Sequence, residues 1–130
     1  MSANVQTFRW IDNRLEMIDQ RTLPAEFTYL SYSSAEEVAT GIRQMVVRGA
    51  PAIGVAAAFG IALEGVRLSN HTMNNFIEGM MKAFHILAES RPTAVNLFWA
   101  LNRMQSLFDS LVVNHSKKSI VDLSLIHISE

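Results

Sequence analysis

The sequence predicts an α+β fold in which an N-terminal antiparallel β-meander precedes a bundle of about four helices. Aromatic and β-branched residues dominate residues 5–32 and are separated by polar turns, which is typical of short strands. From residue 34 onwards the apolar residues recur at helical spacing instead. The chain has 130 residues, of which 49% are hydrophobic, and this is typical of one globular unit. We therefore expect a β-meander over residues 1–32 and a helical domain over residues 33–122.

The first two strands are expected to form a hairpin. Residues 7–11 and 15–18 are strand-like and flank the polar turn Asp12-Asn13-Arg14. Pro24 interrupts the next segment, because proline has no amide hydrogen to donate to a strand ladder. Residues 27–32 then resume an extended, partly alternating pattern, which predicts a third strand.

The first helix is signalled by Ser34 and Glu37, a Ser-x-x-Glu pattern in which the hydroxyl and the carboxylate satisfy unpaired backbone amides. We expect this helix to run from about residue 35 to 47. Apolar residues spaced four, three and one apart would form its buried stripe: Val38, Ile42, Met45 and Val46.

Three further helices are expected. Residues 52–66 are apolar nearly all round and rich in glycine and alanine, which predicts a central buried helix. The third helix ends near Ser90, and its stripe consists of Phe76, Met80, Ala83, Phe84 and Leu87. The fourth follows the break at Arg91-Pro92-Thr93, runs from about 93 to 113, and has the stripe Val95, Leu97, Phe98, Leu101, Met104, Phe108, Leu111 and Val112. An exposed turn is expected at residues 114–118.

Composition excludes several classes of function. The net charge of −1 lacks the basic excess of a general nucleic-acid binder, and no stretch is long and apolar enough for a membrane span. The absence of cysteine removes disulfides, thiolate metal sites and a cysteine nucleophile, and a cytoplasmic protein is the simplest interpretation. We expect no metal site, because the histidines lack ligand spacing to one another or to a carboxylate: His71, His85, His115 and His127. His85 is expected on a helix face, and Glu64 and Glu78 on solvated faces.

An anion site is suggested where the first helix gives way to the second. Arg48 precedes Gly49, Ala50 and Pro51, so a guanidinium and the free amides of a helix start would meet at one point. Arginine donates to phosphate through two parallel hydrogen bonds, and glycine lets the backbone come close. The alternative is an ordinary turn between two helices in which the arginine is solvated.

A second arginine precedes a helix started by proline, in the segment Arg91-Pro92-Thr93. If the second and fourth helices pack side by side in the same direction, Arg48 and Arg91 would face one phosphorylated ligand. The alternative is a capped turn in which Asn96 satisfies a buried neighbour. Spacing alone leaves both interpretations open.

These two segments resemble a known family. Residues 45–58, which contain Arg48-Gly49-Ala50-Pro51, and residues 91–97, which read Arg91-Pro92-Thr93-Ala94-Val95-Asn96-Leu97, closely resemble the N-terminal region of methylthioribose-1-phosphate isomerases. Residues 9–10 and 15–24 are similar to that family's opening, so the resemblance covers roughly residues 5–113. It implies an aldose-ketose isomerase of methionine salvage that converts 5-methylthioribose 1-phosphate to 5-methylthioribulose 1-phosphate without a metal or organic cofactor.

The resemblance also implies that the helical domain over residues 33–122 is the substrate-binding domain, and it implies which residues bind substrate. The family's substrate-binding arginine-glycine-alanine falls on Arg48, Gly49 and Ala50, and a further binding arginine falls on Arg91. The family's catalytic cysteine and aspartate lie in a C-terminal Rossmann-like domain that this chain does not contain, and the full-length parent is expected to be a homodimer. We therefore expect an N-terminal fragment that is inactive alone, with apolar surface where the other domain would dock.

Residues 123–130 depart from the family and resemble a translated cloning adaptor, so they are left out of the fold prediction. Two other functions remain open on the resemblance. The regulatory subunits of the eukaryotic translation initiation exchange factor share this fold and use it for assembly without catalysis. A ribose-1,5-bisphosphate isomerase would prefer the bisphosphate over the methylthio sugar.

Overall fold

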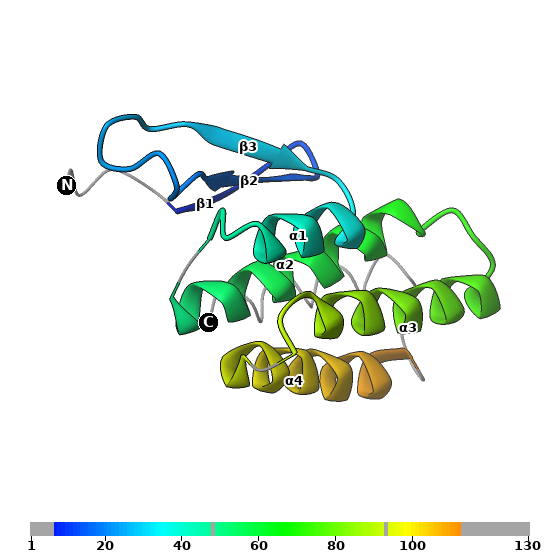
Figure 1. Cartoon of the computed structure of the whole chain (residues 1–130). Helices are drawn as coiled ribbons and strands as arrows, with labels where there is room; N and C mark the ends of the chain where they lie inside the picture. Colours follow the sequence, from blue (N-terminus) through cyan, green and yellow to red (C-terminus); the bar gives the residue numbers. More distant parts are fainter. Residues whose placement is uncertain (1–6, 48, 93, 113–130) are drawn as a thin grey trace.

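The computed structural model describes residues 7–47, 49–92 and 94–112, and in this part of the chain three strands precede four helices (Figure 1). The elements are β1 (Phe8–Ile11), β2 (Arg14–Ile18), β3 (Tyr29–Tyr32), α1 (Ala35–Arg43), α2 (Ala50–Arg67), α3 (Met73–Ser90) and α4 (Val95–Val112). This confirms the predicted α+β fold. The expected turn at 114–118 and the expected non-native tail at 123–130 lie outside the described residues.

The strands form an antiparallel sheet in the order β1-β2-β3, which confirms the hairpin. Asp12 and Asn13 form its two-residue turn with φ angles of 54° and 59°. Aspartate and asparagine tolerate this left-handed conformation better than most residues, and two such residues in succession match the twist of the flanking strands. Arg14, which was expected in the turn, already belongs to β2 and pairs with Ile11. The third strand begins at Tyr29, two residues later than predicted.

One face of the sheet packs on the helices, and the other carries polar side chains. Leu15 and Met17 are fully buried, and the rings of Phe8 and Trp10 each lie 5.8 Å from the ring of Phe59 on α2. On the opposite face Arg9 pairs with Glu16, with 2.8 Å between Nη2 and Oε1. The alternation of apolar and polar positions along β1 and β2 produces this division. In Figure 1 the sheet lies over α1 and α2.

Helix α1 is shorter than predicted. Ser34 caps it as expected, because its hydroxyl accepts a hydrogen bond from the Glu37 amide at 3.2 Å. The helix ends at Arg43, however, and the expected extension to residue 47 is wrong. Met45 has a φ of 62°, which no α-helix accommodates, and its side chain is 45% exposed. Met45 is therefore not part of the buried stripe, whereas Val46 reaches the core from the loop.

Helix α2 is the central helix of the bundle, as predicted. It packs against α1, α3 and α4, and it buries alanine and branched aliphatic side chains: Ile53, Ala56, Ala57, Ala58, Ile61, Ala62 and Leu63. Its alanines and glycines allow neighbouring helices to approach closely. Within residues 7–112, leaving aside 48 and 93, no helix combines the length and apolar character that a membrane crossing requires.

The predicted stripe of α3 is confirmed, since all five of its residues are buried. The stripe of α4 is confirmed only in part. Leu97, Leu101, Met104 and Phe108 are buried, but Val95 and Phe98 are each 60% exposed, and the side chains of Leu111 and Val112 lie outside the described part. Helix α4 is at the edge of the bundle, so only a narrow face is covered and a wide apolar stripe cannot be buried.

Candidate functional site

Helices α2 and α4 lie side by side and run in the same direction (Figure 1). Helix α3 runs in the opposite direction and connects the end of α2 to the start of α4. A Cβ atom placed on Gly54, in the second turn of α2, would lie 3.3 Å from the carbonyl oxygen of Asn96 and 3.3 Å from Cβ of Ala100. Asn96 is in the first turn of α4. The N-termini of the two helices are therefore neighbours at one end of the bundle, as the anion-site hypothesis requires.

The N-terminus of α2 is open. Gly49 is the N-cap, with φ of 93°, a conformation that suits glycine and strains any residue with a Cβ. No side chain in the described part caps this helix, whereas the hydroxyls of Ser34 and Thr72 cap α1 and α3. The first turn contains Pro51 and no acidic residue. Partial positive charge from the first amides therefore remains available to an anion at this end.

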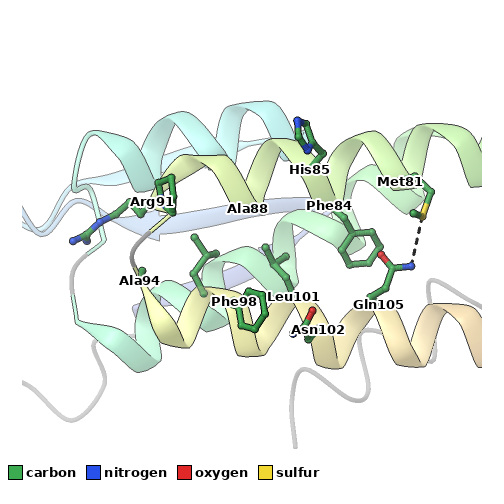
Figure 2. Close-up of a pocket in the computed structure, with 12 residues that line it drawn as sticks. Met81, Phe84, His85, Ala88, Arg91, Ala94, Phe98, Leu101, Asn102 and Gln105 are labelled. Atoms are coloured by element: carbon green, nitrogen blue, oxygen red, sulfur yellow. Dashed lines mark hydrogen bonds between the residues drawn. The ribbon is translucent and has the colours of Figure 1, made fainter.

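Arg91 lies at the junction of α3 and α4. Its carbonyl accepts a hydrogen bond from the Ala94 amide at 3.0 Å, which helps to start α4. Its half-buried side chain points out towards the end of the bundle at which α2 and α4 begin (Figure 2), and no described residue forms a hydrogen bond or ion pair with its guanidinium. Asn96 is exposed, so the alternative in which it satisfies a buried neighbour is wrong. Arg48 lies outside the described residues.

A groove between α3 and α4 begins beside Arg91 and has a volume of about 310 Å³. Its walls are mostly apolar and include Phe84, Leu97 and Phe98 (Figure 2). At its far end the amide of Gln105 donates a hydrogen bond to the sulfur of Met81 at 3.5 Å. A cationic end next to an apolar groove can bind a ligand that has a charged group and an apolar part.

A buried aspartate holds the turn that follows β2, and sequence reasoning missed it. Asp19 directly follows β2 and is only 5% exposed. Its Oδ1 accepts hydrogen bonds from the backbone amide and Nε of Arg21, at 3.0 and 2.9 Å, and its Oδ2 accepts one from Nη2 at 2.8 Å. The side-chain hydrogen bonds from Arg21 lower the pKa of Asp19 below its ordinary value, against the opposing effect of burial. An aspartate two residues before an arginine at a strand end was the available signal.

Asp19 should make stability depend on acid pH. Its pKa is lowered in the folded state, so its contribution is complete above the ordinary value of 3.8 and is lost as the pH falls through the folded value. We expect Asp19→Asn to reduce the fall in the free energy of unfolding below about pH 4. Urea unfolding at pH steps from 7 to 2.5 measures this, with Glu78→Gln, an exposed carboxylate on α3, as the control. Parallel profiles for wild type and Asp19→Asn would contradict the expectation.

The prediction for Glu64 was wrong. It was expected on a solvated face, but it is only 7% exposed. Its Oε1 accepts hydrogen bonds from the Ala35 amide at 3.2 Å and from Nε of Arg67 at 3.1 Å, and Oε2 pairs with Nη2 of Arg67 at 2.6 Å. The carboxylate is buried because it helps to cap α1 and neutralises an arginine one turn along α2. Its partners assign it a structural role in joining two helices.

The other weak candidates are placed as expected. The Glu78 side chain is 70% exposed, and His85 lies on the exposed face of α3, where its Nε2 is 2.9 Å from Oε1 of Glu89. Among residues 7–112, except 48 and 93, no three histidine, aspartate or glutamate side chains are grouped so that they could hold a metal ion. His115 and His127 lie outside the described residues.

Comparison with known sequences identifies relatives. A family model described as the initiation factor 2 subunit family matches residues 46–127. The methylthioribose-1-phosphate isomerase of Albidiferax ferrireducens is 63% identical over 108 residues, which cover 83% of this chain and 30% of that protein. The isomerase of the same name from Pseudomonas aeruginosa is 44% identical over 129 residues, covering 99% of this chain and 36% of its own length.

Solved structures show the same fold. The crystal structure of 5-methylthioribose 1-phosphate isomerase from Pyrococcus horikoshii matches with a TM-score of 0.89 and 41% identity, over 98% of this chain and 36% of that one. Translation initiation factor eIF-2B, subunit delta, from A. fulgidus matches with a TM-score of 0.85 and 32% identity, over 97% of this chain and 36% of that one. The chain spans about a third of the length of these relatives.

Proposed function

Because the chain belongs to the initiation factor 2 subunit family, we propose that it is the sugar-phosphate-binding part of a methylthioribose-1-phosphate isomerase. The whole enzyme would convert 5-methylthioribose 1-phosphate to 5-methylthioribulose 1-phosphate in the cytoplasm, without a metal or organic cofactor and as a homodimer. Residues 33–122 would form the substrate-binding unit, with Arg48, Gly49, Ala50 and Arg91 as the binding residues. The observation that carries this proposal is the common end at which α2 and α4 begin, beside Arg91 (Figure 2).

The chemistry of phosphate suits this end of the bundle. A phosphate group carries up to two negative charges, and the uncapped first turn of α2 offers amide hydrogens and partial positive charge. Arg91 would add a full positive charge and two directed hydrogen bonds, because no described residue forms a hydrogen bond or ion pair with its guanidinium. Acidic residues are absent from the first turns of both α2 and α4, so no carboxylate there would repel the ligand.

The catalytic groups would be supplied by another part of the whole enzyme, and this chain would bind the sugar phosphate without isomerising it. The exposed outer face of α4 would contact that part. Val95, Phe98 and Trp99 are between 60% and 68% exposed there, and exposed apolar side chains that adjoin one another mark contact surfaces.

A second candidate function is favoured by the fold and the family. The delta subunit of a translation initiation factor matches 97% of the chain at a TM-score of 0.85, so a non-catalytic assembly module is compatible with this architecture. Binding of a protein or nucleotide without any binding of sugar phosphate would favour this candidate. The 63% identity to an isomerase supports the first proposal more strongly.

Calorimetric titration of 5-methylthioribose 1-phosphate into the chain tests the proposal. We expect binding to wild type and a loss of roughly tenfold or more in affinity for Arg48→Ala, since a charged hydrogen bond contributes about 1.5 to 3 kcal/mol. Arg103→Ala, which removes an exposed arginine from the outer face of α4, is the matched control and should bind like wild type. Equal binding by all three proteins, or binding by none, would contradict a phosphate site carried by this chain alone.

A further inference from the structure

We propose that Asp19 is a positioning residue for the start of α2, acting through the backbone of the loop that connects α1 to α2. The inference rests on the proposed function, because the element that Asp19 positions is the proposed phosphate site. It extends the site to the β2–β3 connection, which neither the sequence pattern nor the ligand chemistry had included.

The first step is the turn that Asp19 closes. The Asp19 amide donates to the Thr28 carbonyl at 2.7 Å, which continues the pairing of β2 with β3 beyond Ile18. The Asp19 carbonyl accepts from both the amide and the hydroxyl of Thr22, at 3.2 and 2.9 Å. Its carboxylate accepts three hydrogen bonds from Arg21. The backbone and the side chain of Asp19 therefore both stabilise the turn that follows β2.

The second step is the hydrogen bond that joins this turn to the loop between α1 and α2. The Gln20 amide donates to the Val46 carbonyl at 2.8 Å, and the Val46 amide donates to the Gly41 carbonyl at 3.0 Å. Val46 and Val47 are both buried. The turn after β2 and helix α1 thus each hold the connection through one hydrogen bond to Val46. Gly49, the N-cap of α2, is three residues beyond Val46. A displacement of the turn would therefore be transmitted to the start of α2 over a very short length of chain.

The third step is the packing of the end of β3 against α1. Tyr32, at the end of β3, is only 7% exposed and lies against Gly41, where an added Cβ would be 2.8 Å from the tyrosine hydroxyl. Burial raises the pKa of Tyr32, and the negative charge of Asp19 raises it further. Tyr32 therefore packs on Gly41 of α1, the residue whose carbonyl accepts the hydrogen bond from the Val46 amide.

The first test needs no ligand. Amide hydrogen exchange of Gln20 and the NMR chemical shift of the Gly49 amide are compared in wild type, Asp19→Ala and Glu16→Ala. Glu16 also pairs with an arginine, at 2.8 Å, but on the outer face of the sheet. We expect Asp19→Ala to speed exchange at Gln20 by roughly tenfold and to shift the Gly49 amide, because the turn loses the three hydrogen bonds that the carboxylate accepts from Arg21. Glu16→Ala should leave both unchanged. An unchanged Gly49 amide in a folded Asp19→Ala protein overturns the proposal.

The second test uses 5-methylthioribose 1-phosphate as the probe, at a temperature at which every variant is folded by circular dichroism. We expect Asp19→Ala to weaken binding several-fold and Asp19→Asn, which keeps an acceptor for the Arg21 amide, to restore part of it. If Asp19→Ala does not fold, Asp19→Asn supplies both readouts. If wild type does not bind the probe, the proposed function of this chain fails, but the Gly49 amide still decides the positioning role.

Discussion

Replacing Gly54 by leucine is expected to lower the stability of the protein and to abolish sugar-phosphate binding together. An added Cβ at this position would already lie 3.3 Å from the carbonyl oxygen of Asn96 and 3.3 Å from Cβ of Ala100, and leucine adds three further carbons. Because one of these neighbours is backbone, α4 as a whole must move away from α2. Overpacking of this kind costs about 1 to 3 kcal/mol, a large fraction of the stability of a small domain.

Gly60→Leu is the matched control for this prediction. Gly60 is also on α2 and is also closely packed, but an added Cβ there would meet the side chains of Leu87 and Val38. This variant should lose stability while the N-termini of α2 and α4 stay together. Thermal unfolding followed by circular dichroism, with calorimetry of sugar-phosphate binding below the transition, measures both effects. Phosphate affinity retained by folded Gly54→Leu would mean that the α2–α4 contact does not form the site.

The second large effect is expected at the two arginines. If Arg48 and Arg91 bind the same phosphate, each alanine variant should weaken binding by roughly tenfold to a hundredfold, the range for a hydrogen bond to a charged group. The double variant should lose less than the sum of the two free energies, because the first substitution already lets the phosphate move. Calorimetry of wild type, both single variants and the double variant measures this double-mutant cycle.

Salt provides an independent check on the same site. The affinity of wild type should fall as ionic strength rises, and the double variant should show a weaker dependence, since screened charges contribute less. Arg103→Ala controls for the general loss of one positive charge. Fully additive losses in the cycle would place Arg48 and Arg91 at separate sites.

Much of the fold could be predicted because its signals are local. The Ser34 cap, the Asp12 and Asn13 turn and the stripe of α3 each depend on residues within a few positions of one another. The predictions that were wrong depended on what lies across from a residue. Phe98 is apolar and correctly spaced for burial, yet it is exposed because no described element covers that side of α4.

The candidate site was predictable only in part for the same reason. Arginine, glycine and proline at a helix start indicate anion binding wherever they occur, so Gly49 and Arg91 could be singled out from the chain alone. Asp19 could not, because its importance comes from the contact between the Gln20 amide and the Val46 carbonyl, 26 positions apart in the printed sequence. Glu64 was misjudged because its burial depends on the Ala35 amide of a different helix.

The sequence by itself determined the order and type of the elements, the buried face of α3, and the residue types suited to a phosphate. Each of these follows from backbone preferences and from the periodic placement of apolar side chains, which act over short stretches of chain. Only the tertiary structure decided that α2 and α4 run in the same direction with their starts together, and that the Asp19 turn supports the loop before Gly49. Those relations depend on close packing between elements that are distant in sequence, and no local pattern specifies which surfaces will meet.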